Sequence, residues 1–185
     1  MSEIEQKTTL GSEPKIKGAL RKNAVKISKK EEADALSSRG YGTSKNKEFL
    51  LSLYEALYLV DKGMLEVEAK KGKNIGFRDL LERSDSVEEN AWVRFLIYRD
   101  LRSRGYVVRE GFGLGVDFRL YDRGDYSKGT AKYLVLNIQE GKPISMENLI
   151  GAVKQSQNLE KELILAVMNR RGEIVYYSVS QLTFR

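Results

Sequence analysis

The sequence predicts an α/β protein with two domains, and three observations support this prediction. Apolar residues recur at helical spacing in some segments and alternate like half-buried strands in others. Residues 25–85 are dominated by short helical patterns, whereas residues 86–185 follow the order helix, three strands, helix, two strands. The 185 residues, 41% of them hydrophobic, are enough to bury a core in each domain. We therefore expect a small, mostly helical N-terminal domain and a nuclease-like α-β-β-β-α-β C-terminal domain with a mixed sheet.

The first 85 residues divide into an arm and the N-terminal domain. Residues 1–24 are polar and show no sustained hydrophobic period, so we predict a flexible basic arm with a short strand near Ile16. The Lys and Arg side chains of this arm either contact RNA phosphates or are solvated. The pattern Ser-x-x-Glu, typical of a helix start, occurs at Ser28 and Ser52. The predicted elements of this domain are helices that end near Gly40 and Gly63, a strand over 64–68 and a helix over 77–83.

The C-terminal domain is predicted to begin with the longest helix. A third Ser-x-x-Glu pattern, Ser86 with Glu89, precedes an apolar stripe that ends before Gly105. The stripe consists of Ala91, Trp92, Phe95, Leu96, Tyr98 and Leu101. The elements that follow are strands over 106–109, 116–122 and 132–139, a helix over 146–160, a strand over 163–168, a hairpin turn at 169–172 and a last strand over 173–182.

The composition narrows the possible chemistry. The formal net charge of +6, from 32 Lys and Arg against 26 Asp and Glu, favours an anionic partner such as nucleic acid. The chain contains no Cys and no His, which excludes disulfides, thiolate nucleophiles and imidazole catalysis. The N-terminus does not resemble a signal peptide, and polar residues interrupt the richest apolar stretch, residues 49–60. We expect a cytoplasmic protein without a membrane span.

Two strings of the sequence resemble the archaeal tRNA splicing endonuclease family. They are SLYEALYLVDKGMLEV at residues 52–67 and YRDLRSRGYVVREGFGLGVDFRLYDRG at residues 98–124, followed by KYLV and LILAV. The resemblance implies a small N-terminal domain and a nuclease-like C-terminal one. It also implies cleavage of precursor tRNA at the bulge-helix-bulge, without a metal or another cofactor, to a 2',3'-cyclic phosphate and a 5'-hydroxyl.

The family resemblance implies a catalytic triad of Tyr, His and Lys, and this chain departs from it. Tyr121 and Lys161 fall on the family's Tyr and Lys, but Thr130 stands at the His position, in Thr-Ala-Lys-Tyr where the family has His-Ser-Lys-Tyr. The pKa of a threonine hydroxyl is far too high for a general acid. The resemblance therefore points to the noncatalytic structural subunit of an α2β2 heterotetramer, in which a paralogue carries the complete triad.

Further positions follow from the same resemblance. The family resemblance implies an Arg that, together with an aromatic residue near the C-terminus, holds a base of the RNA bulge. Lys154 stands at the position of this Arg, so we expect Lys154 and Lys161 to contact RNA, but more weakly than the Arg and aromatic pair would. The turn with Arg170 and Arg171 stands where the family carries an acidic loop that docks into a basic pocket on another subunit. The last strand is apolar on both faces and is predicted to form a subunit interface through Val175, Tyr176, Tyr177 and Val179.

Other interpretations remain open from the residues alone. Asp117, Glu140 and Lys142 match the letters of a metal-dependent nuclease site, although Gly141 and Pro143 put its second half in a turn. A basic nucleic-acid-binding module is another alternative. Structural roles compete at single positions: Tyr121 as a packing residue, and Lys161 in surface pairs with its flanking glutamates. The cluster of Arg99, Arg102 and Arg104 complements a helix dipole equally well.

Overall fold

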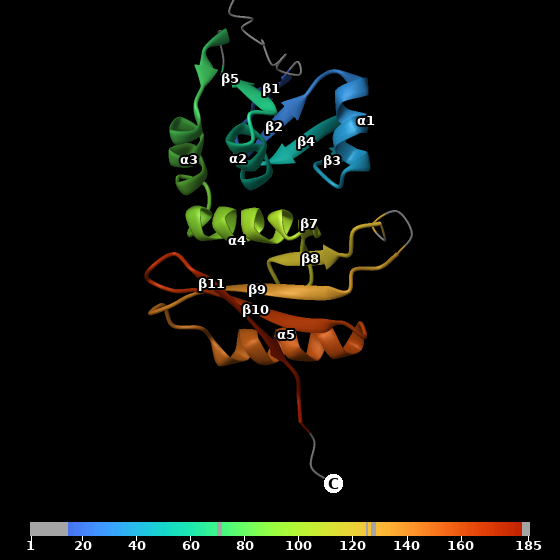
Figure 1. Ribbon diagram of the computed structural model, residues 1–185, viewed down its shortest axis with the longest axis vertical. Helices are drawn as coiled ribbons and strands as arrows, with labels where there is room; N and C mark the ends of the chain where they lie inside the picture. The colour runs from blue at the N-terminus through green and yellow to red at the C-terminus, as the bar shows by residue number, and fades with distance from the viewer. Residues whose placement is uncertain (1–14, 70–71, 125, 127–128, 183–185) are drawn as a thin grey trace, which may run out of the picture.

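A computed structural model describes residues 15–69, 72–124, 126 and 129–182. Two α/β domains lie one above the other, with helix α4, Ala91–Ser103, between them (Figure 1). This arrangement confirms the predicted fold class, with a mixed sheet in each domain. In the part of the chain that is described, no helix is long and apolar enough to cross a membrane.

The N-terminal domain holds a larger sheet than the sequence predicts. Six strands run in the order β3-β4-β2-β1-β5-β6. Their bounds are β1 Ile16–Leu20, β2 Ala24–Ile27, β3 Thr43–Lys45, β4 Glu48–Ser52, β5 Leu65–Glu68 and β6 Asn74–Ile75. The helices are α1 Lys30–Ser38, α2 Leu53–Asp61 and α3 Phe77–Asp85. The short β3 and β6 lack the apolar alternation that identifies a strand in sequence, so only the sheet reveals them.

The predicted arm ends earlier than residue 24. Strand β1 lies inside the sheet, antiparallel to β2 and parallel to β5, so residues 16–20 belong to the N-terminal domain. Residues 1–14 lie outside the described residues. On the outer face of the sheet, Lys15 pairs with Glu66 at 3.3 Å and Lys17 with Glu68 at 3.5 Å. These cross-strand pairs reduce the positive charge that the sequence suggested for RNA contacts.

One of the three predicted helix starts is confirmed. The backbone N–H of Ser52 and its hydroxyl both donate to the Glu55 carboxylate, at 2.9 Å each, where α2 begins. Helix α1 starts one residue later than predicted, after Lys29 instead of Ser28. The prediction at Ser86 is wrong, because its hydroxyl donates to the Arg83 carbonyl at 2.7 Å and thereby closes α3.

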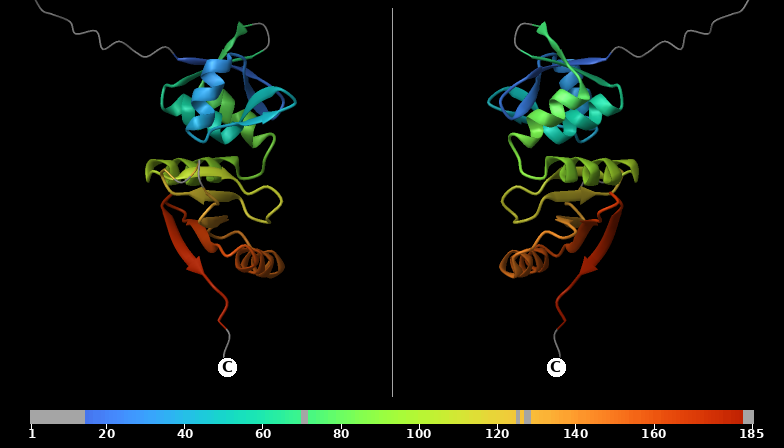
Figure 2. Two further views of the ribbon diagram at one scale, coloured as in Figure 1. Left: turned by 90° about the vertical axis from the view of Figure 1, so that its right-hand side faces the viewer. Right: turned by 90° about the vertical axis from the view of Figure 1, so that its left-hand side faces the viewer.

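The C-terminal domain has the predicted order of elements. Its sheet runs β11-β10-β9-β8-β7, with β9 parallel to β10 and the other pairs antiparallel. The bounds are β7 Val107–Glu110, β8 Phe118–Tyr121, β9 Tyr133–Gln139, α5 Met146–Asn158, β10 Glu162–Met168 and β11 Ile174–Val179. Helices α4 and α5 cover opposite faces of the sheet (Figures 1 and 2). The ends of several strands therefore lie together on two opposite sides of the sheet, one where β9 and β10 begin and one where they end.

The two domains share one core through α4. The Tyr98 ring of α4 lies 4.9 Å from the Tyr54 ring of α2 and 6.0 Å from Phe118 of β8. Val93 and Ile97 of α4 are also buried, beside the predicted stripe. The stripe residue Trp92 is instead 41% exposed.

Candidate functional site at the strand ends

The three triad positions lie at one edge of the C-terminal sheet. Strand β8 ends at Tyr121, and it is antiparallel to β9. Thr130 precedes β9 and Lys161 precedes β10, which runs parallel to β9. In this topology the end of β8 and the beginnings of β9 and β10 meet at the same edge. Residues far apart in sequence are therefore brought together by strand order alone.

Lys161 and Thr130 are in direct contact. The Lys161 ammonium donates a hydrogen bond to the Thr130 hydroxyl oxygen at 2.9 Å. The backbone N–H of Lys161 donates to the Ser156 carbonyl at 2.8 Å, and Glu160 takes a left-handed conformation (φ 54°) that turns the chain from α5 into β10. Among the described residues the Lys161 ammonium contacts Thr130 and forms no ion pair with its flanking Glu160 or Glu162. A cation thus faces the hydroxyl of Thr130, the position at which the family resemblance implies a His.

Tyr121 lies at the same edge and also has a packing partner. Its ring packs edge-on against Tyr126, with 5.2 Å between ring centroids. Tyr126 lies in turn 5.9 Å from the Arg109 guanidinium. The half-buried Tyr121 is therefore consistent with a packing role, and its place in the family's triad stays a prediction from the resemblance.

Comparison with known proteins decides the family. A model of the tRNA intron endonuclease N-terminal domain matches residues 16–81, and one of the catalytic C-terminal domain matches residues 91–176. The chain belongs to the tRNA intron endonuclease family. It is 35% identical to the tRNA-splicing endonuclease of Methanococcus vannielii over 167 residues, which are 90% of this chain and 94% of that protein.

Two further relatives agree with this assignment. The tRNA-splicing endonuclease of Pyrococcus horikoshii is 32% identical over 80% of this chain and 85% of its own length. That of Methanosarcina mazei is 32% identical over 89% of this chain but only 46% of its own length. Membership confirms the family resemblance and supports a role in tRNA intron cleavage.

The two carboxylates of the alternative metal-dependent nuclease site do not come together in the structure. Asp117 accepts a hydrogen bond from the Asn137 backbone N–H at 2.7 Å, whereas Glu140 accepts one from the Arg170 backbone N–H at 3.2 Å. The Lys142 ammonium contacts Asn90 and lies 3.5 Å from Glu89. The carboxylates serve separate loops, and across the described residues no three His, Cys, Asp or Glu side chains are grouped to hold a metal ion.

The predicted hairpin turn is present at one end of the last strand. The Gly172 N–H donates to the Asn169 carbonyl at 3.0 Å, and Gly172 has the left-handed conformation (φ 81°) that such a turn requires. The Asn169 side-chain oxygen accepts from the Arg171 N–H at 2.9 Å. These bonds present Arg170 and Arg171 on an exposed turn.

The last strand divides the predicted interface residues between two faces. Strand β11 is an edge strand, and its Val175 and Tyr177 are 44% and 53% exposed. The Tyr176 hydroxyl donates to the Asp100 carboxylate of α4 at 2.6 Å, so this tyrosine also packs within its own chain, and its place in the interface stays a prediction. Val179 is half-buried and packs against the small core beneath α5.

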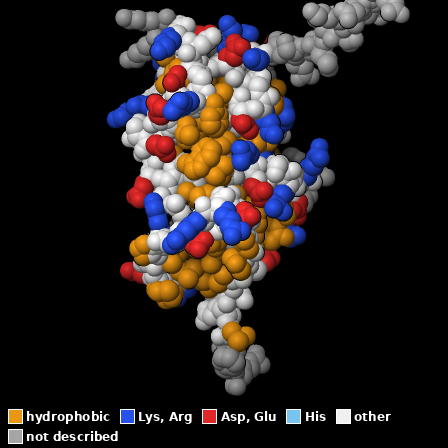
Figure 3. All heavy atoms as spheres, turned by 60° about the vertical axis from the view of Figure 1, so that its left-hand side comes forward, with side chains coloured by type: hydrophobic (Ala, Val, Ile, Leu, Met, Phe, Trp, Pro, Cys, Tyr) orange, Lys and Arg blue, Asp and Glu red, His pale blue; other side chains and the backbone are white. Residues whose placement is uncertain are grey.

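Exposed apolar side chains extend beyond β11. Around α5, Ile144, Met146 and Ile150 are 38%, 63% and 48% exposed. Figure 3 shows apolar side chains gathered over the C-terminal domain. Exposed apolar surface of this kind is typical of a protein interface.

The structure contains a basic cleft between the two domains that the sequence alone does not predict. Its volume is about 490 Å³, and its lining includes Arg39, Arg102, Arg123, Tyr41 and Tyr126. The Arg102 guanidinium lies 3.9 Å from the centre of the Tyr41 ring, so this arginine does more than complement a helix dipole. Within the described part of the chain, no carboxylate lines the cleft. Its residues come from four separate segments, and no local motif could have predicted it.

Proposed function

We propose that this chain is the noncatalytic subunit of a heteromeric tRNA-splicing endonuclease, with a paralogue that carries the complete triad. The observation that supports the proposal is the contact between Lys161 and Thr130 at 2.9 Å. The site keeps the cation and its position relative to β9, but a hydroxyl occupies the place of the proton donor. The chain contains no histidine that could replace it.

The chemistry explains why this replacement matters. The 2'-oxygen attacks the phosphorus and loses its proton to a base, while the P–O5' bond breaks and the leaving 5'-oxygen receives a proton from an acid. Lys161 can still neutralise the charge that builds on the phosphate. Without a suitable acid the reaction loses about 10²- to 10⁴-fold in rate. We therefore assign cleavage to the partner and assembly to this chain.

Charge distribution supports a partner different from this chain. The exposed turn carries Arg170 and Arg171, and the interdomain cleft carries Arg39, Arg102 and Arg123. The turn of one copy would meet a cleft of the same sign in another copy, which is unfavourable. A paralogue with an acidic turn matches the cleft. We propose that Val175 and Tyr177 on the edge strand complete the contact with another subunit.

The proposed RNA contacts of this chain are electrostatic. Lys154 is exposed on α5 and Lys161 follows the end of that helix, about two turns later along the chain. Replacing both with Gln should weaken RNA binding by the assembled enzyme and lower the slope of log affinity against log salt by about one to two. We propose the cytoplasm as the location of this activity.

The proposal is tested by reconstitution. Purified chain should leave a bulge-helix-bulge RNA intact with or without magnesium, and the added paralogue should release cyclic-phosphate ends. Thr130→Ala in this chain should leave the rate of the reconstituted enzyme unchanged, whereas replacing the paralogue's catalytic histidine should abolish cleavage. Specific cleavage by this chain alone, or its loss with Thr130→Ala, would contradict the proposal. Cleavage by this chain that EDTA abolishes would instead favour the metal-dependent alternative.

A further inference from the structure

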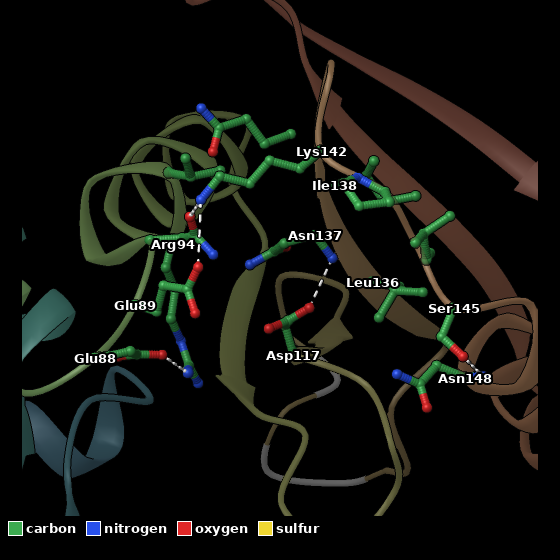
Figure 4. A pocket seen from close by; sticks show the side chains of 15 residues that line it. Glu88, Glu89, Arg94, Asp117, Leu136, Asn137, Ile138, Lys142, Ser145 and Asn148 are labelled. Carbon is green, nitrogen blue, oxygen red and sulfur yellow. Dashed lines mark hydrogen bonds and ion pairs between the residues drawn. The ribbon is translucent and has the colours of Figure 1, made fainter.

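A second pocket lies at the opposite edge of the C-terminal sheet from Thr130 and Lys161. It occupies about 340 Å³ where β9 ends, between the beginnings of α4 and α5 (Figure 4). Ligands of open α/β sheets bind outside the carboxyl ends of parallel strands, and β9 and its neighbour β10 are parallel. The volume lies within the range of small-molecule sites.

The floor of this pocket has unused hydrogen-bonding capacity. Both polar atoms of the Asn137 side chain are buried, and in the part of the chain that the structure describes neither has a hydrogen-bond partner. Figure 4 shows the Asn137 side chain next to Asp117 and extending toward the side of the pocket where Arg94 lies. Because buried polar groups are nearly always paired in native proteins, an unpaired amide in a pocket indicates a missing partner.

Most of the charged side chains around the floor form ion pairs with one another. Arg94 pairs with Glu88 and lies 3.2 Å from Glu110, and Lys142 pairs with Glu89 at 3.5 Å. Asp117 forms no ion pair with any described residue, and one of its oxygens accepts from the Asn137 N–H at 2.7 Å. Burial raises the pKa of this carboxyl. An incoming ion would therefore meet charges of both signs, whereas a neutral ligand with donors and acceptors meets free groups.

The lining of the pocket combines polar and apolar side chains. Val93, Leu136, Ile138 and Ile144 belong to its apolar part. A flat heteroaromatic ring can pack against these side chains and reach the polar floor with its edge. The pocket therefore combines stacking surface with a carboxylate and an amide, a combination suited to a nucleobase.

We propose that this pocket binds a guanine base, with its N1–H and 2-amino group donating to Asp117 and its O6 accepting from the Asn137 amide. Two N–H groups aimed at one carboxylate form charge-assisted hydrogen bonds. Adenine presents an acceptor, N1, at the position of one of these donors, so the carboxylate disfavours it. The guanine can come from a free nucleotide or from an unpaired residue of RNA, and both sources offer the same edge.

The test measures binding by the full chain, by calorimetry, with 5'-GMP, 5'-AMP and the pentanucleotides UUGUU and UUAUU. We expect the guanine ligand of at least one pair to bind about tenfold or more tightly than its adenine counterpart. Asp117→Asn should remove this preference. Glu147→Gln, which changes an exposed carboxylate of α5 outside the pocket, is the matched control and should leave it intact.

Asn137→Leu separates binding from folding. If the amide serves a ligand, this variant should lose guanine binding while its melting temperature stays equal or rises, because an unpaired buried amide is replaced by an apolar group. Selectivity in the GMP pair identifies a free nucleotide as the source, and selectivity only in the RNA pair identifies RNA. Equal affinity for guanine and adenine in both pairs, no binding at millimolar ligand, or an unchanged Asp117→Asn variant would each overturn the proposal. None of these readouts depends on cleavage, so this site and the proposed function can fail separately.

Discussion

Arg109 joins the two domains, and its replacement by Met is expected to destabilise the whole chain. From β7 its guanidinium donates to the Gly40 carbonyl at 3.0 Å and to the Thr43 hydroxyl at 3.1 Å. It also lies 3.6 Å from the Glu55 carboxylate, and the two side chains are only 16% and 6% exposed. Methionine retains the unbranched stem but removes the charge and all the donors.

The expected loss is large because Glu55 would stay buried without its counter-charge. Glu55 also accepts hydrogen bonds from the Gly42 and Ser52 N–H groups, which hold it in place at 3.0 and 2.9 Å. Removing one partner of a buried pair costs about 3–5 kcal/mol. For a chain of this size that corresponds to a fall of about 10 °C in melting temperature. Circular dichroism and Trp92 fluorescence should report one shifted transition, since the core is continuous across α4.

The strand that pairs with β7 offers a matched control for the Arg109 substitution. Arg119 lies directly opposite Arg109 on β8 and is half-buried, and it donates a single hydrogen bond to the Glu110 carbonyl at 3.0 Å. Arg119→Met makes the same chemical change and should cost less than about 1 kcal/mol. Adding Glu55→Gln completes a double-mutant cycle, in which we expect a coupling of about 1–3 kcal/mol. Equal melting temperatures for the two arginine variants, or no coupling, would refute the reasoning.

The remaining predictions concern the last strand and one glycine. Tyr177→Glu should dissociate the assembly in light scattering while the isolated chain keeps its melting temperature, whereas Tyr176→Glu should unfold the chain itself, because that hydroxyl donates to Asp100. Burial and this hydrogen bond raise the pKa of Tyr176, so its contribution to stability is complete below the unfolded pKa of 10.0 and is lost as the pH rises through the folded pKa. Tyr176→Phe should therefore flatten the decline in urea midpoint above pH 10, and an equally steep decline would count against this explanation. Gly42→Ala should lower the urea midpoint by at least the equivalent of about 1–3 kcal/mol, since Gly42 has φ +65° and an added Cβ would lie 2.4 Å from the Phe49 ring. An unchanged midpoint would show that the ring can move aside.

The candidate site could be predicted where the family resemblance assigns its residues. The resemblance places Thr130 and Lys161 at triad positions, and the parallel pairing of β9 and β10 brings these two residues into contact. Tyr176 could not be assigned in the same way. Alternation places Tyr176 and Tyr177 on opposite faces, but sequence does not reveal which face a helix covers. Here α4 covers the face of Tyr176.

The sequence alone determined the two-domain α/β organisation, the family and the absence of histidine, because each depends on periodicity, motif order or composition. Tertiary structure alone decided which polar groups meet. The basic cleft unites Arg39, Arg102 and Arg123, and the opposite pocket unites Asp117 with Asn137, from segments with no common local pattern. Hydrophobic periodicity specifies which side of an element is buried, but the partner of a polar side chain depends on the packing of other elements, which no local window of sequence contains.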